Sequence, residues 1–270
     1  MTKIRTDLAH SDAMSHRVAY FIVRNLVTGF CRTWCRMKVE GREHIPAEGI
    51  FILAPTHRSI LDTPISSGVT RRRMRFMGAD KWWSNPWFGK LLTMLGGFPV
   101  TRGSADREAL KRCITLLEGG EPLVLFPEGE RKSGPIVQPL FEGAAYIAAK
   151  TGAPIVPVGI GGSEKAMPKG AKFIHPKKLH VIVGAPIAPP AGENNKAQRE
   201  AMRVVTAQLH DEADAFAAVI ASVPDDAWAR TGFRSDGAAF TVESFTRYLL
   251  HDPIHHLTDV TGRTWPSSST

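Results

Sequence analysis

The chain is poor in cysteine and has no long uninterrupted apolar segment. Its three cysteines, Cys31, Cys35 and Cys113, form neither a CxxC pair nor an even set. Their number and spacing exclude a disulfide framework and a zinc site built from cysteines alone, and they favour a reducing, cytoplasmic setting. No segment reaches the roughly 18–20 uncharged apolar residues of a membrane-spanning helix. Residues 1–17 contain two aspartates and no apolar core, so we expect no secretory signal there.

The excess positive charge is confined to the N-terminal part of the chain. Residues 1–110 hold 17 Lys/Arg and 9 Asp/Glu, a difference of +8, whereas the remainder holds 17 of each. Such a field attracts phosphate groups, either on nucleic acid or on an anionic membrane. Neither a zinc-finger spacing nor an RNA-binding aromatic signature is present. The sequence therefore favours a membrane, and not nucleic acid, as the partner.

An N-terminal segment, HRVAYFIVRNLVTGFCRTWCRMKV (residues 16–39), combines apolar, aromatic and basic residues. This composition predicts a helix that lies in a membrane interface while its arginines reach lipid phosphates. The alternative is an amphipathic helix that packs on the core and leaves a solvated basic edge. We predict that residues 1–39 form an amphipathic membrane-interface segment. Its basic residues within the helix are Arg17, Arg24, Arg32, Arg36 and Lys38.

Strand-like and helix-like segments alternate over residues 40–221. We expect strands at 49–55, 74–79, 121–129, 153–162 and 178–187, and helices at 85–95, 104–120, 141–152 and 196–223. The segment between 96 and 103 is either a short strand or a loop. Alternation of this kind is typical of an α/β domain.

A histidine and an aspartate follow the first of these strands. The run FILAPTHRSILDTP places His57 and Asp62 at the strand's carboxyl end, where open α/β sheets bind ligands. On a regular helix five residues turn through about 500°, so the two side chains could not meet there. They can meet if His57 lies in the loop and Asp62 in the first helical turn. One ring nitrogen would then donate to Asp62, and the other would point outward as a general base for a substrate hydroxyl. The alternative is a surface loop whose polar residues only cap a helix.

A second strand is followed by cations. The run LVLFPEGERKSG again ends its apolar part at a proline, after which Gly129 permits a tight turn and Arg131 and Lys132 can hold a phosphate. The run PVTRG adds Arg102. If the three strand ends converge, they would suit an acceptor that carries both a hydroxyl and a phosphate. The alternative is that Arg102 and Arg131 are solvated surface charges.

Four runs of the sequence resemble the conserved blocks of one enzyme family. THRSILD resembles the HX4D block of the glycerolipid acyltransferases, the 1-acylglycerol-3-phosphate acyltransferase family. GGFPVTR, FPEGER and APIVPVGI are similar to its second, third and fourth blocks, in the same order. The resemblance implies an α/β fold with a mixed sheet flanked by helices, to which the rest of the sequence adds an N-terminal amphipathic helix and a C-terminal helical tail. It also implies transfer of a fatty acyl group from acyl-CoA or acyl carrier protein to a glycerol hydroxyl, without a metal or an organic cofactor.

The resemblance assigns roles to individual residues. It makes His57 the catalytic base and Asp62 the carboxylate that orients it. The expected substrate-binding residues are Arg102, Glu128, Gly129 and Arg131, and Pro157 matches the fourth block.

Two positions depart from the family pattern. Thr101 stands where the second block often has aspartate, and Glu130 stands where the third block often has threonine. A carboxylate beside a phosphate site weakens phosphate binding unless it points away, so Glu130 bears on the identity of the acceptor.

The combined prediction is an enzyme at the cytoplasmic face of a membrane that acylates 1-acylglycerol 3-phosphate and yields phosphatidate. His57 removes the hydroxyl proton as the oxygen attacks the thioester, and loop amides near Gly129 or after His57 are candidates to bind the oxyanion. Three alternatives stay open. The same chemistry could act on glycerol 3-phosphate or a glycosylated phospholipid, the protein could be a non-catalytic membrane-binding module, or water could replace the acceptor as in a thioesterase.

Residues 222–270 are predicted to form a helical tail with a disordered end. The run LLHDPIHHL places His251 and His255 four residues apart, with Pro253 between them. Residues 222–262 are similar to the C-terminal part of DinB-like four-helix metalloproteins, whose metal-binding histidines lie partly in such a stretch. We predict no metal site and interpret the tail as an appended helical element or a remnant of such a domain.

Overall fold

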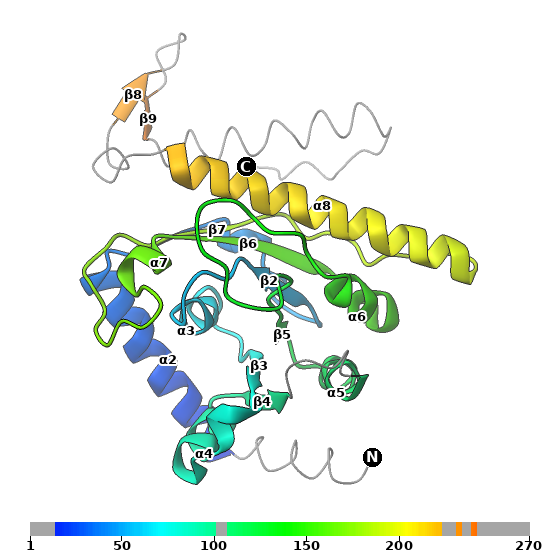
Figure 1. Cartoon of the computed structure of the whole chain (residues 1–270), viewed down its shortest axis with the longest axis horizontal. Helices are drawn as coiled ribbons and strands as arrows, with labels where there is room; N and C mark the ends of the chain where they lie inside the picture. Colours follow the sequence, from blue (N-terminus) through cyan, green and yellow to red (C-terminus); the bar gives the residue numbers. More distant parts are fainter. Residues whose placement is uncertain (1–13, 101–106, 223–230, 234–238, 242–270) are drawn as a thin grey trace. The chain divides into compact units, whose positions relative to one another are not determined.

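Seven strands in the described part of the chain form one mixed sheet, in the order β1-β7-β6-β2-β5-β3-β4 (Figure 1). The computed structural model describes residues 14–100, 107–222, 231–233 and 239–241. The strands are β1 (Lys38–Glu40), β2 (Ile52–Pro55), β3 (Arg75–Ala79), β4 (Gly97–Val100), β5 (Leu123–Val124), β6 (Ile155–Gly161) and β7 (His180–Val183). Neighbouring strands are parallel except β6 and β7, which are antiparallel. The predicted mixed α/β sheet is confirmed.

Helices flank this sheet. They are α2 (Met14–Trp34), α3 (Asp62–Gly68), α4 (Pro86–Met94), α5 (Arg107–Glu118), α6 (Gly143–Thr151), α7 (Ser163–Ala166) and α8 (Asn195–Ser222), with short 3₁₀ turns at Arg42–His44 and Asp80–Trp83. Successive residues of a strand point to opposite faces of the sheet. Leu53 accordingly packs in one apolar cluster with α2 and α3 residues such as Tyr20 and Ile65, whereas Ile52 packs in a second with α5, α6 and α8 residues such as Leu117.

The central strand β2 carries the candidate site. All four of its residues are buried, and it lies between β5 and β6. Pro157, the proline of the predicted fourth block, is opposite Ala54 in the β2–β6 ladder. Because β2, β5 and β6 are parallel, the loops that follow them emerge at one edge of the sheet.

Most element predictions match the structure, with shorter bounds. The predicted helix at 85–95 is α4, where Pro86 occupies the first position and the Asn85 side chain accepts hydrogen bonds from the Trp87 and Phe88 amides. β1 and α7 were not predicted, because three or four residues are too few to display a hydrophobic period.

The helix α2 packs one face on the core. Tyr20, Arg24, Thr28 and Cys31 are its buried residues. Arg24 was expected to reach lipid phosphates, but it is 9% exposed and its Nε donates to the carbonyl oxygen of Ser67 at 3.0 Å. None of the helices in the described ranges is both long enough and apolar enough to cross a bilayer.

Contacts divide the chain into two units, Met1–Ala218 and Val219–Thr270. Within the tail expected to be helical, the structure describes two strands, β8 (Thr231–Phe233) and β9 (Ala239–Thr241), which pair antiparallel. These residues are therefore extended and not helical. His251 and His255 lie outside the described residues, so the hypotheses about the rest of the tail stay predictions.

Candidate active site

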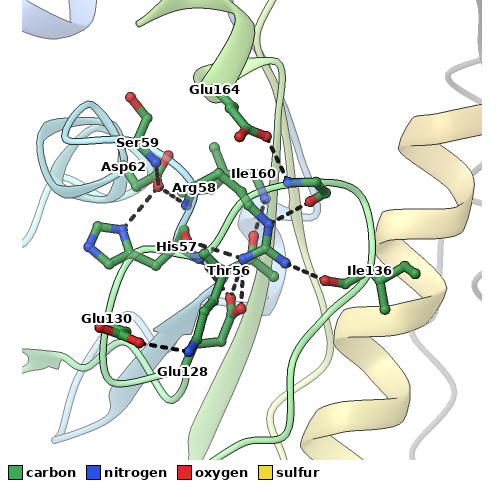
Figure 2. A network of polar contacts seen from close by, with 12 residues as sticks. Thr56, His57, Arg58, Ser59, Asp62, Glu128, Glu130, Ile136, Ile160 and Glu164 are labelled. Carbon is green, nitrogen blue, oxygen red and sulfur yellow. Dashed lines mark hydrogen bonds and ion pairs between the residues drawn. The ribbon is translucent and has the colours of Figure 1, made fainter. Parts of the chain in front are cut away.

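His57 and Asp62 meet as the sequence predicts. His57 lies in the loop after β2, and Asp62 is the first residue of α3. His57 Nδ1 is 3.1 Å from Asp62 Oδ2, and the two side chains are 13% and 0% exposed. Because a carboxylate only accepts, Nδ1 carries the proton and Nε2 is left with a lone pair. Figure 2 shows the second ring nitrogen pointing away from Asp62. The ring is thus arranged to accept a proton at Nε2.

Asp62 also organises the loop that carries His57. Its Oδ2 accepts hydrogen bonds from the amides of Arg58 and Ser59, both at 2.6 Å. Its Oδ1 has no hydrogen-bond partner among the described residues. The amides that follow His57 therefore serve the carboxylate and are not available to a substrate oxyanion. This removes one of the two groups of amides that the sequence suggested for that role.

The imidazole has a second restraint. The His57 ring stacks on the Phe126 ring with centroids 3.9 Å apart and an interplanar angle of 21°. Phe126 lies just beyond β5, so the parallel neighbour of β2 delivers it to the same sheet edge. Sequence reasoning missed this contact, although Phe126 opens the FPEGER run. Asp62 holds the ring edge and Phe126 one ring face, which together fix the direction of Nε2.

No nucleophile accompanies His57 within the described part of the chain. Ser59 is 1% exposed, and its hydroxyl donates to the Met167 carbonyl at 2.9 Å. Burial raises the pKa of the Cys31 thiol to about 11 and that of Cys113 to about 12. These buried thiols are protonated at neutral pH, so they are not nucleophiles. The site is thus suited to direct transfer to an external hydroxyl and not to an acyl-enzyme intermediate.

Gly129 forms the predicted tight turn. Its φ of +71° lies in the left-handed region, and a Cβ added there would stand 2.8 Å from the Phe141 ring. Its amide donates to the Phe126 carbonyl at 3.0 Å, so this amide is also engaged within the protein. The Glu128 carboxylate, expected to bind substrate, is 0% exposed and bonded to Arg58. The structure gives Glu128 no exposed oxygen with which to bind a substrate.

The loop after β5 brings cations next to His57. The Lys132 amide donates to the His57 carbonyl at 2.9 Å, which joins the two strand ends. Glu130, the departure from the family pattern, forms an ion pair with Lys132 at 2.8 Å (Figure 2). Arg131 is exposed and has no side-chain partner among the described residues. The local pairing of Glu130 therefore leaves Arg131 as the uncompensated cation of this loop.

The third predicted strand end is only partly visible. β4 ends at Val100, and Arg102 lies outside the described residues. Its membership of the site thus stays a prediction. No group of three or more His, Cys, Asp or Glu side chains with metal-binding geometry occurs in the described ranges.

Comparison with known proteins agrees with this geometry. Residues 36–161 match the family model described as Acyltransferase. The chain is 30% identical over 185 residues to the 1-acyl-sn-glycerol-3-phosphate acyltransferase of Bacillus subtilis, covering 66% of this chain and 90% of that protein. It is 29% identical to the chloroplastic enzyme BAT2 of Brassica napus over 65% of this chain, but spans only 52% of that protein.

A solved structure agrees as well. The crystal structure of the 1-acyl-sn-glycerophosphate (LPA) acyltransferase PlsC from Thermotoga maritima superposes with a TM-score of 0.56 and 26% identity, covering 77% of this chain and 87% of that one. Fold and site thus define an O-acyltransferase of phospholipid biosynthesis. The chain belongs to the glycerolipid acyltransferase family typified by 1-acylglycerol-3-phosphate acyltransferases.

Proposed function

We propose that the protein transfers a fatty acyl group from acyl-CoA or acyl carrier protein to the hydroxyl of 1-acylglycerol 3-phosphate, producing phosphatidate. The observation that carries this proposal is the hydrogen bond from the Lys132 amide to the His57 carbonyl, which sets the His57–Asp62 pair beside the loop of Arg131. The names of the relatives support the same acceptor. The thioester is a co-substrate, and the proposed chemistry needs no metal or organic cofactor.

In the proposed reaction His57 Nε2 takes the proton of the acceptor hydroxyl as its oxygen attacks the thioester carbonyl. Asp62 stabilises the imidazolium through Nδ1–H, as its 3.1 Å contact permits. The tetrahedral intermediate collapses with departure of the thiolate, which leaves readily and then takes the proton held at His57 Nε2, so that the base is restored. Arg131 pairs with the acceptor phosphate, together with Arg102 if it joins the site. Holding the hydroxyl next to the base lowers the barrier through positioning.

The acceptor is tested by comparing phosphorylated and unphosphorylated substrates. We expect thiol release from acyl-CoA on addition of lysophosphatidate. Arg131→Gln is expected to raise the KM for lysophosphatidate by about tenfold or more, because a charge-assisted hydrogen bond to phosphate is lost. The KM for monoacylglycerol, which has no phosphate, is expected to stay unchanged.

The matched control for Arg131 is Arg203→Gln, since Arg203 is also an exposed arginine, 70% exposed on α8. Thiol release without any acceptor would show that the protein hydrolyses the thioester, and it would overturn the proposed acyl transfer. Release with glycerol 3-phosphate alone would change the acceptor. Equal effects of Arg131→Gln on both acceptors would refute its role as a phosphate ligand.

We also propose that the enzyme works as a peripheral protein at the cytoplasmic face of an anionic membrane. The outer face of α2 exposes an apolar residue at every fourth position: Met14, Val18, Ile22, Leu26, Phe30 and Trp34. α2 contacts α4 (Figure 1), on which Trp87 is 82% exposed. Lys90 Nζ lies 5.6 Å from the Trp87 ring centroid. Exposed aromatic and aliphatic side chains flanked by cations are typical of proteins that insert into a membrane interface.

Vesicle binding tests this surface. Ile22→Glu with Leu26→Glu is expected to weaken binding to phosphatidylglycerol-containing vesicles by about tenfold or more, because two apolar side chains leave the bilayer and two negative charges approach it. The control is Val204→Glu on α8, since Val204 is 58% exposed. Sedimentation with vesicles measures both variants. Equal binding of the α2 variant and the wild type would contradict the proposed orientation.

A further inference from the structure

A buried ion pair next to the base has no part in the proposed chemistry. Arg58 Nη1 lies 2.7 Å from Glu128 Oε1 and 2.6 Å from Oε2, and the two side chains are 9% and 0% exposed. Arg58 follows His57 in the chain, and Glu128 precedes Gly129. Figure 2 shows the contacts between the Arg58 and Glu128 side chains. A buried pair of charges is costly to form unless its geometry is good and its other donors are satisfied.

The remaining donors of Arg58 bind the loop that carries Arg131, which we call the 128–137 loop. Arg58 Nε donates to the Gly134 carbonyl at 2.9 Å, and Nη2 donates to the Ile136 carbonyl at 3.1 Å. Nη1 also reaches the His57 carbonyl at 3.1 Å. The planar guanidinium can donate hydrogen bonds to several acceptors in different directions at once, whereas a lysine ammonium is a compact point charge.

The 128–137 loop forms hydrogen bonds with both the amide and the carbonyl of His57. Glu128 Oε1 accepts a hydrogen bond from the His57 amide at 3.0 Å. The Lys132 amide donates to the His57 carbonyl at 2.9 Å. At its far side the loop is tied to α7, because the Gly134 amide donates to Glu164 Oε2 at 3.1 Å. Each of these bonds joins the 128–137 loop to an element distant in sequence.

We propose that Arg58 and Glu128 are positioning residues that fix the distance between the base His57 and the cation Arg131. The inference rests on the proposed function, because it explains how the acceptor hydroxyl can lie at His57 while the acceptor phosphate lies at Arg131. Arg131 has no side-chain partner among the described residues, so its place depends on the backbone that carries it. Arg58 supplies two of the bonds that hold that backbone.

The kinetic test uses Arg58→Lys, which keeps the charge and removes the planar guanidinium. We expect a KM for lysophosphatidate about tenfold higher and a lower kcat, with the KM for acyl-CoA unchanged. In the Arg58→Lys background, Arg131→Gln is expected to add little to the acceptor KM, because Arg131 is already misplaced. Fully additive effects of the two substitutions would overturn the proposal, since a merely structural role leaves Arg131 effective.

A second measurement does not depend on activity. Amide hydrogen exchange is expected to be about tenfold faster at Lys132 and Gly134 in Arg58→Lys and in Glu128→Gln, and unchanged in β6. The control is Arg42→Lys, because Arg42 is a half-buried arginine that donates to the Gly68 carbonyl. Unchanged exchange in the loop would overturn the positioning role. If the variants exchange faster but the wild type shows no acceptor-dependent thiol release, the role of Arg58 and Glu128 in holding the loop stands and only the proposed function is refuted.

Discussion

Replacing His57 by alanine is expected to lower kcat about 10³-fold or more, because the substitution removes Nε2, the proposed acceptor of the hydroxyl proton. The KM for the acceptor is expected to change little, since Arg131 lies on a different loop. The fold is expected to persist, because Asp62 keeps its bonds to the Arg58 and Ser59 amides. Thiol release from acyl-CoA in the presence of lysophosphatidate measures the loss.

The control for His57 is a pair of the same kind elsewhere in the molecule. His210 Nδ1 lies 3.1 Å from Asp214 Oδ2 on α8, four residues apart. His210→Ala is expected to leave kcat unchanged, which shows that losing a His–Asp contact alone does not impair turnover. Retention of wild-type kcat in His57→Ala would exclude His57 as the base. If His57→Ala loses both turnover and its thermal unfolding transition, kcat is measured in His57→Asn instead, because the asparagine side chain is closer in volume to histidine.

The variant Asp62→Asn is expected to lower kcat by about 10²-fold or more while the free energy of unfolding changes little. The side-chain oxygen of asparagine can still accept the bonds from the Arg58 and Ser59 amides, but it carries no charge to stabilise an imidazolium. Asp62→Ala is different, because it leaves two amides without their acceptor at a 0% exposed position. An unsatisfied buried amide costs about 1–3 kcal/mol, so this variant is expected to lose stability as well.

Two measurements separate these effects. Denaturant unfolding is expected to place Asp62→Asn near the wild type and Asp62→Ala well below it, whereas kcat is expected to fall in both. Asp214→Asn serves as the control, since Asp214 contacts a histidine at the same distance. If Asp62→Asn were fully active, the carboxylate would serve only to build the loop, and the charge that stabilises the imidazolium would have to come from another group.

The local patterns of the sequence singled out His57 and Asp62 as a candidate pair, and the family resemblance gave the pair its roles. A buried strand that ends at a proline, followed by a histidine and then an acidic residue in a helical first turn, depends on residues within one short run. The prediction that the pair can meet if His57 lies in the loop and Asp62 in the first helical turn is confirmed, because α3 starts at Asp62. Strand and helix periods are also local, which explains why most elements of the sheet were predicted correctly.

The sequence left two alternatives for the N-terminal helix, and each describes one face of it. Tyr20, Thr28 and Cys31 pack on the core, as the amphipathic alternative requires. The opposite face exposes Ile22 and Leu26, as the membrane hypothesis requires. The burial of Arg24 was not predictable, because its acceptor is the carbonyl of Ser67, 43 positions away. A hydrophobic pattern identifies a stripe but not the element that covers it.

The orientation of the Glu130 side chain could not be predicted from the sequence either. A carboxylate in the third block either faces the phosphate site or turns from it, and both conformations suit a surface loop. The structure pairs it with Lys132, two residues along. Phe126 is comparable: its place in an apolar run predicts burial, but its stacking on the His57 ring follows only from the pairing of β2 with β5.

The sequence by itself determined the class of fold and the family, and it predicted His57 as the base and Asp62 as its carboxylate, because these depend on residue types at short spacings. The tertiary structure decided which distant groups surround them. Glu128 is separated from Arg58 by 70 positions and from His57 by 71, and all three meet because β2 and β5 are parallel neighbours in the sheet. Strand order is set by the packing of the whole chain, so no short stretch of sequence reveals that Arg58 and Glu128 share one buried contact.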